Sequence, residues 1–120
     1  MLTAMIFAKD LDRMTGFYRD GFDLSVDAAG SSDGYTVLVG DGVRMSLHAL
    51  PDHIASEITI SDPPALRTAS AFKLLLGVAD PPATLAHLER LGAQSFDTGD
   101  DDIWDLFDPE GNSLRIHPLP

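Results

Sequence analysis

Apolar residues recur at helical spacing in two stretches of the chain. An aspartate stands directly before each stretch, Asp10 before the first and Asp80 before the second. A carboxylate at this position accepts hydrogen bonds from the free N–H groups of the first helical turn. We therefore predict two N-capped helices whose apolar faces pack on a sheet. The apolar residues at this spacing are Leu11, Met14, Phe17 and Tyr18 in the first helix, and Leu85, Leu88 and Leu91 in the second.

Strands are predicted on both sides of each helix. The apolar runs Leu2–Ala8 and Phe72–Val78 precede the helices, and Asp41-Gly42 marks a two-residue hairpin turn within the segment from Gly34 to Leu50. Residues that face each other across a hairpin share one side of the sheet. The predicted pairs on one side are Tyr35 with His48, Val37 with Ser46 and Val39 with Arg44. The other, more apolar side faces the helix and carries Thr36, Leu38, Met45 and Leu47.

A second hairpin is predicted near the end of the chain. If Asp108–Gly111 forms a four-residue loop, then Phe107 opposes Asn112, Leu106 opposes Ser113 and Trp104 opposes Arg115. In this register Leu114 and Ile116 face the helix. Trp104, Arg115 and His117 then lie on the opposite side of the sheet.

The order strand, helix and three strands thus occurs twice. We predict an α+β fold in which two βαβββ modules form a single domain over residues 1–120. Module one covers residues 1–50, a connector with little periodicity covers 51–71, and module two covers 72–118.

Two motifs carry a resemblance to a known family. The stretch from Asp10 to Tyr18 and the later Asp108-Pro-Glu-Gly-Asn112 with its following strand resemble the vicinal oxygen chelate superfamily. This superfamily includes glyoxalase I, bleomycin-resistance proteins and extradiol dioxygenases. The resemblance covers Leu2 to Pro118 and implies a curved mixed sheet around a pocket, and a homodimer.

Composition narrows the classes of partner. Nineteen acidic against eight basic residues give a formal net charge of −11, which repels nucleic acid and anionic membranes. No apolar run reaches the length of a membrane span, and the first residues of the sequence do not show a basic segment followed by the apolar core of a signal peptide. We expect a cytoplasmic protein that binds neither nucleic acid nor a membrane. The absence of cysteine excludes thiolate metal ligands and a cysteine nucleophile.

The resemblance also implies where metal ligands would stand. Metal-dependent members of the superfamily take His, Gln or Glu from the first and last strands of each module. The matching positions here are Thr3, Ser46, Lys73 and Arg115. Since two are weak neutral ligands and two are cations, we expect no metal cofactor and no glyoxalase I-type lyase activity. A displaced divalent-metal site that uses His48 and His117 is the alternative.

The predicted pocket still contains groups that suit a small ligand. Cationic Lys73 and Arg115 favour an anionic ligand unless internal carboxylates such as Asp105 or Asp102 pair with them. The predicted ligand-binding residues are Met5, Phe7, Tyr35, Ser46, His48, Lys73, Trp104 and Arg115.

Three functions remain open from the sequence. The first is metal-independent binding of a small organic ligand, anionic or aromatic. The second is an enzyme, either a metal-dependent lyase, isomerase or dioxygenase, or a metal-free one with His48, Tyr35 and Arg115 as candidate catalytic residues. The third is a non-catalytic interaction or regulatory domain.

Overall fold

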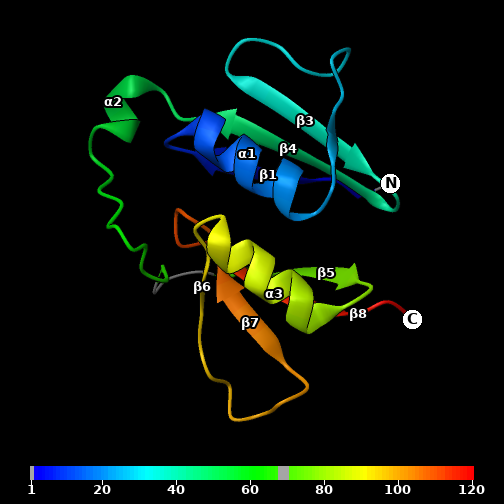
Figure 1. The fold of residues 1–120 in the computed structure, drawn as a ribbon. Coiled ribbons are helices and arrows are strands. Elements are labelled where there is room, and N and C mark those ends of the chain that lie inside the picture. The colour runs from blue at the N-terminus through cyan, green and yellow to red at the C-terminus, as the bar shows by residue number, and fades with distance from the viewer. Residues whose placement is uncertain (1, 68–70) are drawn as a thin grey trace. The chain divides into compact units, whose positions relative to one another are not determined.

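The computed structural model describes residues 2–67 and 71–120 and divides into two compact units, Met1–Thr59 and Ile60–Pro120. Each unit contains a four-stranded sheet with one longer helix (Figure 1). We call them unit 1 and unit 2 and describe each by itself. Both have the order βαβββ and a mixed sheet, so the predicted α+β class with two such modules is confirmed.

Unit 1 contains a sheet with the strand order β1-β4-β3-β2. Strands β1 and β4 are parallel, whereas β4 with β3 and β3 with β2 are antiparallel. The elements of this unit are β1 (Ala4–Ala8), α1 (Leu11–Gly21), β2 (Ser25–Val26), β3 (Tyr35–Gly40), β4 (Val43–Ala49) and the short α2 (Asp52–Ala55).

The β3–β4 hairpin has the predicted register. Tyr35 pairs with His48, Val37 with Ser46 and Val39 with Arg44, because Asp41 and Gly42 form a two-residue connection. Helix α1 packs against β3 and β4. The core of unit 1 therefore lies between α1 and the predicted apolar side of the sheet, and its buried side chains include Met14, Phe17, Tyr18, Leu38, Met45 and Leu47.

Unit 2 repeats this arrangement with the strand order β5-β8-β7-β6. Strands β5 and β8 are parallel, and the other two pairs are antiparallel. Helix α3 packs against β6, β7 and β8 over a core that includes Leu88, Leu106, Leu114 and Ile116. The elements are β5 (Leu74–Val78), α3 (Pro81–Arg90), β6 (Gln94–Ser95), β7 (Trp104–Phe107) and β8 (Ser113–Pro118).

Both helices begin as the sequence predicts. The side chain of Asp10 accepts a hydrogen bond from the backbone N–H of Arg13, and that of Asp80 accepts one from Ala83, each at 3.1 Å. Pro81 occupies the first turn of α3, where its missing N–H costs nothing.

The register predicted for the second hairpin is wrong by one residue. The backbone N–H of Asp108 donates to the carbonyl of Asn112, so the loop between them has three residues rather than four. Gly111 closes this turn with a φ of 86°, which a residue with a Cβ rarely adopts. As a result Phe107 pairs with Ser113, and Asp105 takes the place opposite Arg115 that the sequence analysis gives to Trp104.

No helix in the described part of the chain is long and apolar enough to cross a membrane.

Gly16 lies within α1, at a position where the structure leaves room for a side chain. A Cβ at this position would meet only the end of the Arg19 side chain, at 3.8 Å. Gly42 has equally open surroundings, but its φ is 71°.

We therefore predict that Gly16→Ala raises the free energy of unfolding by about 1 kcal/mol, because alanine loses less backbone entropy in a helix. Urea unfolding of the full chain measures this change. Gly42→Ala is the matched control, and its left-handed backbone makes it destabilising by about 1 kcal/mol. A Gly16→Ala variant that is no more stable than the parent protein would contradict the prediction.

Candidate functional site

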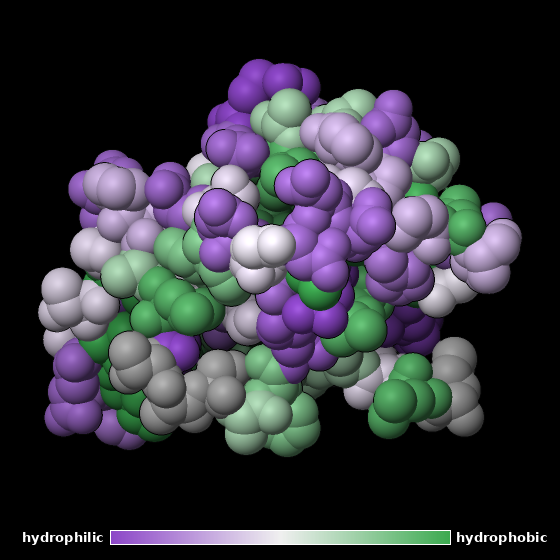
Figure 2. Space-filling view, turned by 90° about the horizontal axis from the view of Figure 1, so that it is seen from below, coloured by the Kyte–Doolittle hydropathy of each residue, from purple (hydrophilic) through white to green (hydrophobic). Residues whose placement is uncertain are grey.

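Each sheet has one side covered by a helix and a second side that we call its open face. Opposite residues in a sheet share a face, so the registers assign each residue to one side. Several large apolar side chains on the open faces remain exposed, including Met5, Phe7 and Leu75. Figure 2 shows apolar patches among hydrophilic residues on the surface seen in that view.

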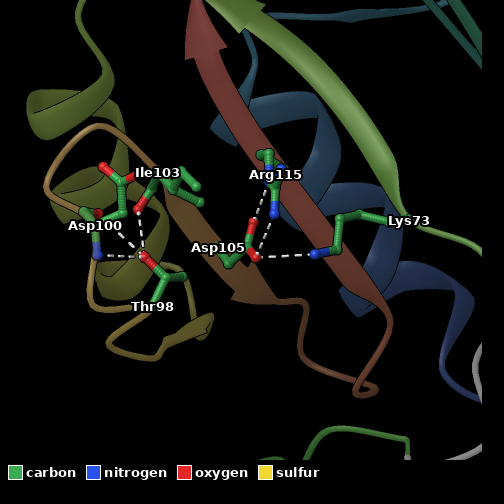
Figure 3. A network of polar contacts seen from close by, with 6 residues as sticks. All are labelled: Lys73, Thr98, Asp100, Ile103, Asp105 and Arg115. Atoms are coloured by element: carbon green, nitrogen blue, oxygen red, sulfur yellow. Dashed lines mark hydrogen bonds and ion pairs between the residues drawn. The ribbon is translucent and has the colours of Figure 1, made fainter.

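The open face of unit 2 is built around one buried carboxylate. Asp105 on β7 is 4% exposed, and both of its oxygens accept hydrogen bonds from cations (Figure 3). Arg115 donates from Nε to Oδ1 at 2.6 Å and from Nη2 to Oδ2 at 2.9 Å. Lys73, directly before β5, donates from Nζ to Oδ2 at 2.9 Å. We call Lys73, Asp105 and Arg115 the charge cluster.

The cations of the charge cluster remain partly accessible. The side chains of Lys73 and Arg115 are 33% and 35% exposed, whereas that of Asp105 is 5% exposed. The bonds to Asp105 use two N–H groups of the guanidinium and one of the ammonium. The sequence leaves open whether internal carboxylates pair with Lys73 and Arg115, and the structure shows that Asp105 pairs with both. The cluster still has a formal charge of +1, because one carboxylate cannot neutralise two cations.

The charges also perturb each other's protonation. Hydrogen bonds from Arg115 hold the pKa of Asp105 below its ordinary value, an effect that burial opposes and Lys73 reinforces. The same hydrogen bonds raise the pKa of Arg115 above its ordinary value. Asp105 and Arg115 are therefore both charged at neutral pH.

Trp104 does not share the face of Arg115, which corrects the sequence prediction. The three-residue turn pairs Trp104 with Ile116, a fully buried residue on the helix side. Asp105 and Phe107 point to the open face instead, and Phe96 stacks on Phe107 with ring centroids 6.3 Å apart. The sequence analysis missed Phe107 because it counted one residue too many in the loop, whereas Phe96 lies outside that hairpin.

The open face of unit 1 brings together most of the other predicted ligand-binding residues. Met5 lies beside Ser46 and Phe7 beside His48 on neighbouring strands. The His48 ring lies 5.6 Å from that of Phe7 and 5.5 Å from that of Tyr35, between centroids. Met5 and Phe7 are 48% and 50% exposed.

Ser46 is on this face but is buried, with 4% exposure. Part of the face is covered by the loop between β2 and β3, since a Cβ on Gly30 would lie 3.3 Å from a methyl group of Val37. Asp27 in this loop forms an ion pair with Arg44 at 3.3 Å. The exposed part of the face is therefore the side that carries Met5, Phe7 and His48.

The residues at the four implied metal-ligand positions do not fit a divalent cation. Lys73 and Arg115 bring positive charge, and the carboxylate beside them already accepts their hydrogen bonds. Thr3 and Ser46 offer only hydroxyl groups. Within residues 2–67 and 71–120, no group of three or more His, Asp or Glu side chains is placed to hold a metal ion.

The two histidines of the alternative metal site belong to different units. His48 lies on β4 of unit 1, and His117 lies on β8 of unit 2. Nδ1 of His117 is 2.9 Å from the carbonyl oxygen of Pro118, which a ring N–H at Nδ1 can donate to. A displaced metal site at His48 and His117 therefore stays a hypothesis.

The profile of one protein family, described as a glyoxalase-like domain, matches residues 3–117. The chain belongs to the glyoxalase-like domain family. No curated protein matches it. The match to the family profile covers residues of both units and of the connector between them.

Solved structures of this glyoxalase-like fold are similar over nearly their whole length. A glyoxalase/bleomycin resistance protein/dioxygenase family enzyme from Burkholderia phytofirmans PsJN is 20% identical, with 98% of this chain and 97% of that chain covered and a TM-score of 0.71. The fosfomycin resistance protein FosX from Listeria monocytogenes, in complex with manganese(II) and a dihydroxypropylphosphonic acid, is 12% identical, with 100% and 90% covered and a TM-score of 0.73.

A third similar structure is the bleomycin-binding protein from Streptomyces verticillus, in complex with copper(II)-bleomycin. It is 14% identical, with 99% of this chain and 95% of that chain covered and a TM-score of 0.62. At these identities the three structures establish the fold of the glyoxalase-like chain and leave its ligand open.

The charge cluster predicts a pH-dependent contribution of Asp105 to stability. Its folded-state pKa lies below the unfolded-state value of about 4, so its stabilisation is complete above that pH and is lost as the pH falls through the folded-state pKa. We predict that Asp105→Asn lowers the free energy of unfolding most above about pH 4 and progressively less below it. Urea unfolding at a series of pH values measures the difference.

Asp101→Asn, in the exposed loop before β7, controls for the loss of one negative charge. A difference between the parent protein and Asp105→Asn that stays constant or grows as the pH falls would contradict the role assigned to the ion pairs.

Proposed function

We propose that this glyoxalase-like protein binds a small organic anion through Lys73 and Arg115 and needs no metal ion to do so. The observation that carries the proposal is the charge cluster. Two partly exposed cations are held in place by one buried carboxylate, on the open face of unit 2. Arginine offers a planar set of donors that suits a carboxylate or phosphonate, and lysine adds a second positive charge.

The cluster is positively charged, although the chain as a whole is strongly acidic. The chain has a formal net charge of −11, whereas the cluster has a net charge of +1. Because the three groups are already ordered, an anion that binds here does not have to fix two long side chains by itself. Charge-assisted hydrogen bonds at such a site are stronger than neutral ones.

Two similar structures support a small-molecule ligand in general. One contains a phosphonic acid with manganese(II), and the other contains copper(II)-bleomycin. We extend to this chain only the binding of a small organic molecule. The ring contacts of Phe7, Tyr35 and His48 in unit 1 offer a second, apolar surface for ligand contacts.

The competing function is a metal-dependent lyase, isomerase or dioxygenase that uses His48 and His117. The part of the chain that the structure describes places neither histidine in a group of three or more candidate ligands. We therefore assign no metal ion to His48 and His117. The metal-free enzyme with His48, Tyr35 and Arg115 as catalytic residues stays an alternative.

We predict that small carboxylates bind to the parent protein and that Lys73→Met weakens their binding about tenfold, as expected for one lost charge-assisted hydrogen bond. Asp105 still accepts two bonds from Arg115 in this variant, so the fold is preserved. Titration with acetate, followed by two-dimensional NMR of the full chain, measures the dissociation constants.

Arg90→Gln is the matched control, because it removes one positive charge from α3, on the other side of the same sheet. The uncharged acetamide is the matched ligand. Equal affinity of Lys73→Met and the parent protein for acetate, or equal binding of acetamide, would rule out the proposed anion site.

A further inference from the structure

The open face of unit 2 places aromatic rings beside the charge cluster. Strands β6 and β7 pair Gln94 with Phe107 and Ser95 with Leu106. One further step of this register brings Phe96 opposite Asp105, and the N–H of Phe96 donates to the carbonyl of Asp105 at 3.3 Å. Phe96 and Asp105 therefore share the open face.

One row of side chains thus crosses this face from strand to strand. Leu75 on β5 pairs with Arg115 on β8, and Arg115 pairs with Asp105 on β7. The next residue across the sheet is Phe96, which lies opposite Asp105 directly after β6. The charged pair in the middle has an apolar residue on either side. Leu75 and Phe96 are 62% and 40% exposed, so both apolar ends of the row are accessible.

The aromatic end of the row is reinforced by a second ring. Phe96 and Phe107 are stacked, with ring centroids 6.3 Å apart and an angle of 25° between the planes. Neighbouring strands lie about 4.8 Å apart, so Phe96 is about two strand spacings from the backbone of Arg115. The Arg115 side chain covers part of this span because it reaches across to Asp105.

We propose that the open face of unit 2 binds an aromatic carboxylate, with its carboxylate on Lys73 and Arg115 and its ring against Phe96. This inference rests on the proposed function and adds the chemical class of the ligand. A planar ring suits a stacked aromatic pair, since offset-stacked and edge-to-face contacts stabilise it beyond simple burial. The charge of the ligand complements the +1 cluster, and its ring shields the new hydrogen bonds from water.

Benzoate, acetate and cyclohexanecarboxylate are the probes that test this inference on the full chain. We expect benzoate to bind about tenfold more tightly than acetate, with cyclohexanecarboxylate between them. In Phe96→Ala we expect the affinity for benzoate to fall to within about threefold of that for acetate, while acetate binds as it does to the parent protein. Phe96→Leu keeps an apolar side chain and is expected to retain part of the preference.

Ile54→Ala is the matched control, because Ile54 on α2 of unit 1 is an apolar residue with the same 40% exposure as Phe96 and lies outside both open faces. Loss of the benzoate preference in Ile54→Ala but not in Phe96→Ala would overturn the inference. Equal affinities of the parent protein for benzoate and acetate would also overturn it and leave the proposed anion site intact. Failure of all three carboxylates to bind would instead reject the proposed function itself.

Discussion

The turn between β7 and β8 fixes the arrangement on which the candidate site depends. Asp108 is fully buried, and its Oδ1 accepts the backbone N–H groups of Glu110 and Asn112 at 2.9 and 3.0 Å. Its Oδ2 accepts the side-chain amide of Asn112 at 2.8 Å. These bonds hold a three-residue turn, which sets the register of the hairpin. Because a shift of one residue moves every side chain to the other face, this turn decides which groups meet Arg115.

Once Asp105 lies opposite Arg115, electrostatics determines the rest of the site. A buried carboxylate is costly unless cations and hydrogen bonds compensate it. Arg115 and Lys73 provide both, and their own side chains stay about a third exposed. The compensation of one buried charge therefore also orders two cations on an open surface. In this way a requirement of folding produces a feature that can bind a ligand.

Much of the fold follows from local signals in the sequence. The aspartate caps and the spacing of Met14, Phe17 and Leu88 predict both helices, since capping and burial agree there. The Asp41-Gly42 turn predicts the register of β3 and β4 because a two-residue connection leaves little choice. The register of β7 and β8 could not be obtained by counting residues, because the bonds of the Asp108 side chain shorten the loop by one residue.

The candidate site was predictable only in part for the same reason. The resemblance to the superfamily points to Lys73 and Arg115, and the sequence names Asp105 and Asp102 as possible partners, but the predicted register does not bring Asp105 opposite Arg115. The exchange of Trp104 for Asp105 and Phe107 on the open face needed the three-dimensional turn. Phe96 carried no sequence signal, since its place follows from the pairing of a two-residue strand with β7.

This glyoxalase-like chain holds cations paired with Asp105 at two of the positions where the resemblance to the superfamily implies metal ligands. The metal content of protein purified without a histidine tag tests this interpretation most directly, together with thermal denaturation in the presence of nickel, zinc, manganese or iron(II). We predict no stoichiometric metal and no increase in melting temperature with any of these ions. Stoichiometric metal that is lost in His48→Ala and His117→Ala would contradict this prediction.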